Sequence, residues 1–238
     1  MRLAVIGNSH IGSLKRAWDR ISEEYASVEI VFFGAKGGGL GHLKVRGSRI
    51  VPTDKKVLNS IKFISRGHTG FDPTKHDVVL IYGVQGQPFF FPLENFYSAQ
   101  CIRRVMEDLV RGRLHFRLAT MIRRLSDIPV YIGHRPLSAE ERISENQNLD
   151  SYTKGMALLN ETMFAPMNVH MISQPAETIV NGNATDLKYT IGSRRLAVGN
   201  AIDDDPHPEE DVNHMNDEFG ELWLRKFFAE LGVERTEE

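Results

Sequence analysis

The chain begins with a short apolar run that passes directly into a helical pattern. Residues 3–6 are apolar and uncharged, and Gly7 ends the run. A run of that length closed by glycine is typical of a strand buried on both faces. From Ile11 onward, apolar residues recur three and four positions apart, which predicts a helix. A strand that leads through a tight turn into a helix is the repeating unit of α/β folds. The rest of the chain is therefore expected to repeat this unit.

The same pattern recurs along the chain. Further short apolar runs lie at 28–33, 77–82, 128–133 and 168–172. Helical patterns cover 55–64, 98–125 with a break at Gly112, 138–165 and 218–231, while 45–51 fits a short strand or a hairpin. Strands that alternate with helices imply a parallel sheet with right-handed crossovers. We therefore predict one domain over residues 1–238, a three-layer α/β/α sandwich with a flavodoxin-like five-stranded parallel sheet in the order 2-1-3-4-5.

Charge and cysteine content exclude several classes of protein. The net charge is -2, from 29 basic and 31 acidic residues, which gives no general reason to expect nucleic acid or an anionic membrane as partner. Cys101 is the only cysteine, so an intrachain disulfide and a zinc-thiolate cluster are excluded. We see no apolar run of membrane-spanning length and no secretory signal pattern, and we expect a cytoplasmic protein.

Ser9 lies in the turn after the first predicted strand. In open α/β sheets such turns lie at the carboxyl ends of the strands, where ligands bind. Ser9 has two interpretations. It can be the N-cap of the following helix, a common role for serine. It can also be a nucleophile whose neighbouring N–H groups bind an oxyanion, which requires a base from elsewhere in the chain.

A candidate base lies near the other end of the chain, in the segment Asp211-Val-Asn-His214. An aspartate carboxylate three positions from a histidine can accept its Nδ1–H, which fixes the tautomer and leaves Nε2 as a base. The alternative is that Asp211 caps the last helix and that His214 lies in its first turn.

Three other segments have unusual composition. Residues 34–41 contain five glycines, which suits close approach to a ligand or a flexible loop, but they form neither a P-loop nor a G-x-G-x-x-G motif. Phe89, Phe90 and Phe91 lie between two prolines and either pack a loop onto the core or line an apolar pocket. Residues 203–211 are acidic and suggest a metal, but their prolines and lack of ligand periodicity favour a solvated loop.

Four segments, in this order, resemble the conserved blocks of the SGNH (GDSL-like) hydrolases. Gly7-Asn8-Ser9 follows the first strand, Gly34-Ala-Lys-Gly37 the second and Gly83-Val-Gln85 the third, and Asp211-x-x-His214 precedes the last helix. The resemblance covers nearly the whole chain. Two positions differ from the family pattern, because Asn8 replaces an aspartate and Gln85 replaces an asparagine.

The resemblance implies a role for each block. Ser9 would be the nucleophile, His214 the base and Asp211 the group that orients it. The oxyanion hole would comprise the N–H groups of Ser9 and Gly37 with the side chain of Gln85. From their positions beside these blocks, we also expect Asn8, Phe89 and Phe90 among the substrate-binding residues, with Phe89, Phe90 and Phe91 at the mouth of the site and at least one of them against the acyl group.

We therefore expect a serine esterase that hydrolyses a small acyl ester, such as an O-acetylated sugar, through an acyl-enzyme intermediate, with no cofactor and no metal. Its partner would be a small-molecule or glycan ester, and the sequence predicts no oligomeric state. One alternative is an O-acyltransferase that uses the same Ser-His-Asp site. The other is a non-catalytic module that binds an anion or glycan on the same fold.

Overall fold

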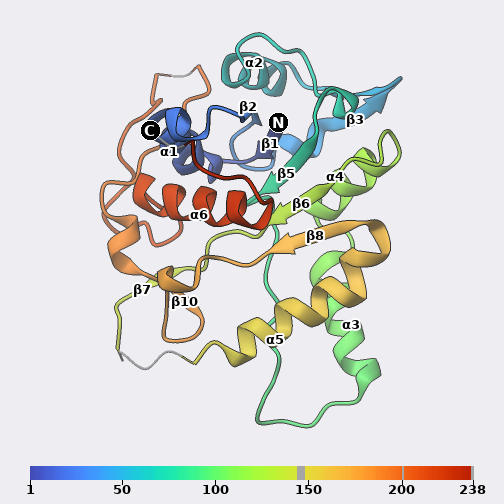
Figure 1. The fold of residues 1–238 in the computed structure, drawn as a ribbon, viewed down its shortest axis with the longest axis vertical. Coiled ribbons are helices and arrows are strands. Elements are labelled where there is room, and N and C mark those ends of the chain that lie inside the picture. The colour runs from blue at the N-terminus through green and yellow to red at the C-terminus, as the bar shows by residue number, and fades with distance from the viewer. Residues whose placement is uncertain (144–147, 200, 237–238) are drawn as a thin grey trace.

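The computed structural model describes residues 1–143, 148–199 and 201–236. Its centre is a five-stranded, all-parallel sheet in the order β2-β1-β5-β6-β8 (Figure 1). The strands are β1 (Arg2–Gly7), β2 (Glu29–Gly34), β5 (Val78–Tyr82), β6 (Val130–Gly133) and β8 (Val169–Ile172). This is the predicted order, and each strand lies within about two residues of the apolar run that predicted it.

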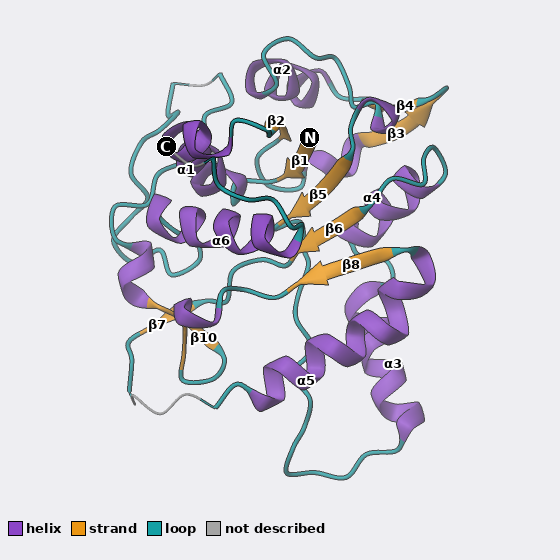
Figure 2. Ribbon diagram, viewed as in Figure 1, coloured by secondary structure: helices purple, strands orange, loops and turns teal. Residues whose placement is uncertain are grey.

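Within the described residues, six α-helices cover the two faces of this sheet (Figure 2). They are α1 (Ile11–Ile21), α2 (Lys55–Ile64), α3 (Ala99–Val110), α4 (Leu114–Arg123), α5 (Asp150–Leu159) and α6 (Asp217–Glu230). Shorter helical turns are Ser22–Tyr25, Gly39–His42, Pro73–Lys75, Asn160–Phe164, Ala165–Met167, Ala176–Thr178 and Leu187–Thr190. None of the helices in the described ranges is long and apolar enough to cross a membrane.

The side chains of β1 divide the core into two halves. Leu3 and Val5 pack on one side with α1 and α6, while Ala4 and Ile6 pack on the other side with residues of α2 to α5. This alternation is the period-two geometry of a strand, and here both sides are apolar because both faces are covered by helices. The predicted three-layer α/β/α sandwich is confirmed.

Smaller elements refine the prediction. The segment at 45–51 is a hairpin of β3 (Leu43–Arg46) and antiparallel β4 (Arg49–Pro52). The helical pattern at 98–125 splits into α3 and α4, with Gly112 at a φ of +80° between them, as predicted.

The prediction of a mainly helical segment at 138–165 is wrong for its first part. Ala139–Glu140 forms β7, which pairs with β10 (Ala184–Asp186), and β10 also pairs with β9 (Ile179–Val180). The backbone N–H of Ala139 donates to the carbonyl of Val212, so long-range pairing replaces the local helical pattern. Residues 144–147 of this prediction lie outside the described residues.

Candidate active site

Ser9, His214 and Asp211 form a continuous hydrogen-bonded chain at the carboxyl end of β1. The Oγ of Ser9 lies 2.9 Å from Nε2 of His214. The Nδ1 of His214 lies 2.8 Å from Oδ2 of Asp211. All three residues are partly buried, so the site is partly shielded from solvent and still accessible to it. The two segments that the sequence singled out at opposite ends of the chain therefore meet.

The helix-capping interpretations of Ser9 and Asp211 are both wrong. His10 is the N-cap residue of α1, and no side chain caps that helix end. The cap of α6 is Asn216, whose side chain accepts a hydrogen bond from the N–H of Phe219. The hydroxyl of Ser9 and the carboxylate of Asp211 are thus directed to the imidazole of His214.

Asp211 is held in place by its own chain. Its Oδ1 accepts from the N–H groups of Asn213 at 2.8 Å and His214 at 3.0 Å, which leaves Oδ2 for the imidazole. Burial raises the pKa of the Asp211 carboxyl. The hydrogen bonds from Asn213 and His214 together lower it by more than burial raises it, so the pKa lies below its ordinary value. An ionised Asp211 accepts the Nδ1–H, and Nε2 of a neutral His214 is then an acceptor for the Ser9 hydroxyl.

Helix packing brings the two ends of the site together. Ser9 leads into α1 and His214 precedes α6, and these two helices lie side by side on one face of the sheet (Figure 1). The guanidinium of Arg16 in α1 donates to the carboxylate of Asp217 at the start of α6, at 2.7 Å. The same guanidinium donates to the backbone carbonyl of Arg194 at 3.1 Å. Arg16 therefore links both helices to the loop that precedes the acidic segment.

Two backbone N–H groups in the predicted oxyanion positions are unused. Within the described part of the chain, neither the N–H of Ser9 nor that of Gly37 has an internal hydrogen-bond partner. Gly37 is exposed and has a φ of +58°, a conformation that favours glycine. Asn8 turns its side-chain oxygen back to the N–H of His10, at 3.3 Å, so it supports the turn that carries Ser9.

The side chain of Gln85 has a contact that the sequence did not predict. Its Oε1 accepts from the N–H of Leu114 at 3.1 Å, and it satisfies one of the N–H groups at the start of α4. No hydrogen bond joins the Gln85 side chain to Ser9, Gly37 or His214 among the described residues. Gln85 thus anchors the loop after β5 to α4, and the structure gives it no direct link to Ser9.

The three phenylalanines do lie on the loop after β5, but they face the core. Phe89 is 6% exposed and belongs to the apolar cluster on the side of α2 to α5. Phe90 packs against Tyr152 with ring centroids 5.6 Å apart, and Lys154 lies over the ring of Phe91. The structure thus favours the core-packing interpretation over the acyl-pocket interpretation, because α5 covers this loop.

Sequence reasoning missed two histidines that flank His214. The rings of His207 and His214 are stacked, with centroids 4.1 Å apart and an interplanar angle of 15°. On the other side, His10 stacks on His214 at 4.8 Å and 22°. The position of His10 next to Ser9 was a signal that could have found it. His207 lies in the acidic segment 203–211 and gave no local signal.

The acidic segment is largely exposed, as predicted, but two of its carboxylates are anchored. Asp203 pairs with Lys36 of the glycine-rich loop at 3.3 Å and accepts from the N–H of Val198 at 2.9 Å. Asp204 pairs with Arg16 at 3.6 Å. These contacts anchor the start of the segment to α1 and to the glycine-rich loop.

One group of side chains has the composition of a metal site. His207, Asp211 and His214 each offer a ligand atom, and these atoms lie within 4.8 Å of one another. A shared ion needs lone pairs that converge on one point. Here the rings of His207 and His214 lie nearly parallel. The two nitrogens of His214 are already engaged in hydrogen bonds, Nε2 with Ser9 and Nδ1 with Asp211. We therefore assign these groups to hydrogen bonding and stacking.

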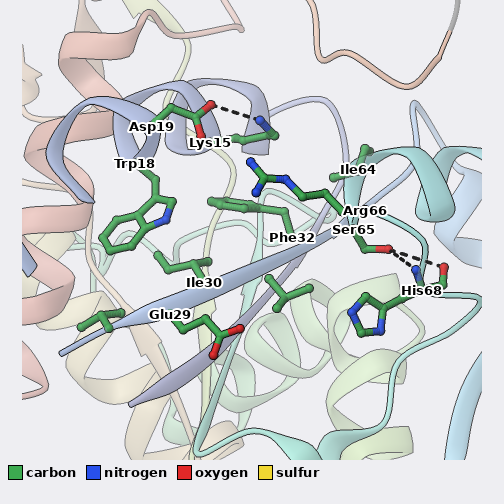
Figure 3. Close-up of a pocket in the computed structure, with 12 residues that line it drawn as sticks. Lys15, Trp18, Asp19, Glu29, Ile30, Phe32, Ile64, Ser65, Arg66 and His68 are labelled. Carbon is green, nitrogen blue, oxygen red and sulfur yellow. Dashed lines mark hydrogen bonds and ion pairs between the residues drawn. The ribbon is translucent and has the colours of Figure 1, made fainter. Parts of the chain in front are cut away.

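A surface pocket lies away from these residues, beside the edge strand β2 (Figure 3). Trp18 of α1, Phe32 of β2 and Arg66 after α2 contribute to its lining. The ion-paired Lys15 and Asp19 line it as well. Ser9, Asp211 and His214 are not among the residues that line it. The pocket is therefore separate from the candidate active site.

Comparison with known proteins gives weak similarities. No protein-family model matches the chain, and no curated protein matches it. Among solved structures, a protein from Agrobacterium tumefaciens provisionally named an arylesterase is 10% identical, with a TM-score of 0.41 over 97% of this chain and 98% of that one. A Bacillus subtilis protein is 13% identical, with a TM-score of 0.41 over 98% of this chain and 57% of that one.

A third structure, a gut microbial diltiazem-metabolizing enzyme, is 8% identical, with a TM-score of 0.36 over 74% of this chain and 37% of that one. The chain thus spans well under two thirds of the length of two of these three proteins. At these identities and TM-scores, none of them identifies a family or an activity for this chain.

Proposed function

We propose that this protein is a serine esterase of the SGNH type that hydrolyses a small acyl ester, such as an O-acetylated sugar. The observation that carries the proposal is the hydrogen-bonded chain from the Ser9 hydroxyl through His214 to Asp211. A hydroxyl, an imidazole and a carboxylate in this order are the parts that acyl transfer needs.

In the first half of the reaction, His214 Nε2 takes the Ser9 proton while the Ser9 Oγ bonds to the acyl carbon. The carbonyl electrons move onto its oxygen, and the N–H groups of Ser9 and Gly37 are the donors we assign to that oxyanion. When the intermediate collapses, the carbon–oxygen bond to the alcohol breaks, and the alcohol leaves with the proton from His214. Ser9 then carries the acyl group as an ester.

In the second half, His214 takes a proton from water, and the water oxygen bonds to the acyl carbon. The bond to Ser9 Oγ breaks, the proton returns to that oxygen, and a carboxylic acid leaves. Asp211 stays ionised throughout and stabilises the imidazolium that forms in each half. Gln85 was assigned from the resemblance as a third oxyanion donor, and its contact with Leu114 makes it the donor most in need of a test.

The function is tested with p-nitrophenyl esters of graded acyl length and with a fluorophosphonate probe, on the wild type and on Ser9→Ala. We expect hydrolysis and labelling by the wild type, and a loss of roughly 10⁴–10⁶ in kcat for Ser9→Ala. If the folded wild type neither hydrolyses these esters nor becomes labelled, the site binds ligands without catalysis. If Ser9→Ala keeps most of the activity, the chemistry lies elsewhere in the molecule.

A further inference from the structure

His214 lies between two other imidazole rings, His10 on one face and His207 on the other. The ring centroids are 4.8 Å and 4.1 Å from that of His214, and the interplanar angles are 22° and 15°. A hydrogen-bonded Ser-His-Asp chain needs no such stack, because Ser9 and Asp211 already engage both nitrogens of His214. The stack therefore calls for a separate explanation.

The position of His207 is fixed by a short backbone pairing. Its N–H donates to the carbonyl of Ser193 at 3.0 Å, and the N–H of Arg195 donates to the carbonyl of Asp205 at 2.9 Å. The hydroxyl of Ser193, itself buried, lies 3.2 Å from Nδ1 of His207. This pairing presents the face of the ring, and not its nitrogen atoms, to His214.

His10 is fixed on the opposite side. It is 8% exposed and follows Ser9 directly, and its Nδ1 is buried with no hydrogen-bond partner among the described residues. An unpaired buried nitrogen costs stability, so hydrogen bonding through Nδ1 does not account for the burial of this ring against His214.

Both flanking rings are neutral near neutral pH. Burial, followed by the nearby His214 and Arg135, lowers the pKa of His10 to about 3. Burial, followed by His214, lowers the pKa of His207 to about 4. The face of a neutral aromatic ring attracts a cation placed above it, whereas a second imidazolium would repel it.

We propose that His10 and His207 are positioning residues that hold the imidazolium form of His214 between their two faces. The inference rests on the proposed function, because the imidazolium forms each time His214 takes a proton from Ser9 or from water. The two rings also restrain rotation of His214 out of the line between Ser9 and Asp211. Stabilisation of the charged form makes His214 a stronger base for the Ser9 proton.

Other charged and titratable groups surround this stack, and the test must hold them constant. Asp211 bonds to His214 from the segment before α6. Arg135 after β6 acts on His10, while Arg195 and Arg16 act on His207. A substitution at His207 changes none of these groups, and His207 is only partly buried, so this position is the best one to vary.

The test compares His207→Leu with His207→Phe. Both side chains cover the face of His214 and exclude water, but only phenylalanine offers an aromatic face. We expect the pKa of His214, followed by NMR of its ring protons and assigned with His214→Gln, to fall by roughly 0.5–1 unit in the leucine variant. The phenylalanine variant should keep the wild-type value. The acid limb of kcat/KM should shift by the same amount in the same direction.

Equal His214 pKa values in the leucine and phenylalanine variants would overturn the proposal, whatever their activity. If the leucine variant does not fold, His207→Ile replaces it as the non-aromatic member of the pair, and a His214 pKa equal to that of the phenylalanine variant would equally overturn the proposal. The NMR titration needs no substrate. It therefore reports on the stack even if the esterase assays and the Ser9→Ala control show that the proposed function is wrong.

Discussion

Replacing Gly220 by alanine tests whether the packing of α1 against α6 sets the distance between Ser9 and His214. A Cβ atom built on Gly220 would lie 2.6 Å from the carbonyl carbon of Ser13 and 3.1 Å from the nitrogen of Leu14, with the carbonyl oxygen of Ser13 closer still. These are backbone atoms of α1, so no side-chain rotation can relieve the clash. The two helices must move apart.

The size of the movement follows from the same distances. Ordinary contact begins at 3.4 Å, so the 2.6 Å approach to the Ser13 carbonyl carbon is short by 0.8 Å, and the closer carbonyl oxygen makes this a lower limit on the movement. Ser9 leads into α1 and His214 lies just before α6, and their 2.9 Å hydrogen bond would lengthen beyond the usual range if the helices separate by that amount. A misplacement of about 1 Å costs on the order of 100-fold in rate. Overpacking should also lower the free energy of unfolding by about 1–3 kcal/mol.

The assay measures kcat on a p-nitrophenyl ester together with urea unfolding. The matched control is Leu118→Ala, which removes a fully buried side chain of α4 on the opposite face of the sheet and should cost about 2–5 kcal/mol. We expect Gly220→Ala to lose activity and Leu118→Ala to keep it at temperatures where both are folded. Similar kcat values in the two folded variants would refute the argument that helix packing sets the site.

Three further predictions concern single groups. Asp211→Asn should lower kcat by about 10³–10⁴, less than Ser9→Ala, because it disturbs the imidazole tautomer and spares the nucleophile; a larger loss would contradict this role. Gln85→Ala should lower the free energy of unfolding by about 1 kcal/mol with little change in kcat if the side chain serves α4, whereas a 100-fold loss of kcat would assign it to the oxyanion. Burial lowers the pKa of His134 to about 4, so the unfolded chain binds more protons than the folded one between that pH and about 6.5. The free energy of unfolding should therefore rise with increasing pH across this window, and fall as the pH is lowered, by up to about 1.4 kcal/mol per unit for this group, and His134→Gln should flatten the dependence in urea titrations.

The strands of the sheet were predictable because each is buried on both faces and therefore consists of a short uncharged run. The turn at Ser9 was predictable for the same reason, since glycine ends the run and the helical period begins at Ile11. The meeting of Ser9 with His214 was not a consequence of periodicity. It followed from the order of four short segments. Local sequence alone favoured helix capping for Ser9 and Asp211, but the N-cap residues of α1 and α6 are His10 and Asn216.

The features that the sequence did not predict all depend on contacts between irregular segments of the chain. His207 reaches His214 only because residues 193–195 pair with residues 205–207, and neither segment has a periodic pattern. Gln85 reaches α4 through a left-handed backbone conformation, with a φ of +54°, which no side-chain pattern reveals. Strand β7 forms because Ala139 finds partners more than forty positions away.

The position of His214 depends on how the start of α6 is anchored. Asn216 caps the helix with its side-chain oxygen, and its side-chain amide donates to the carbonyls of Lys188 at 3.2 Å and Ile191 at 3.1 Å. Met215, between Asn216 and His214, is 3% exposed. The cap and the buried methionine together fix where the chain enters α6, and with it the position of the adjacent His214. The base is therefore held by α6 and by the turn at 187–190, whereas the nucleophile is held by β1 and α1, and only the packing of these elements brings the two together.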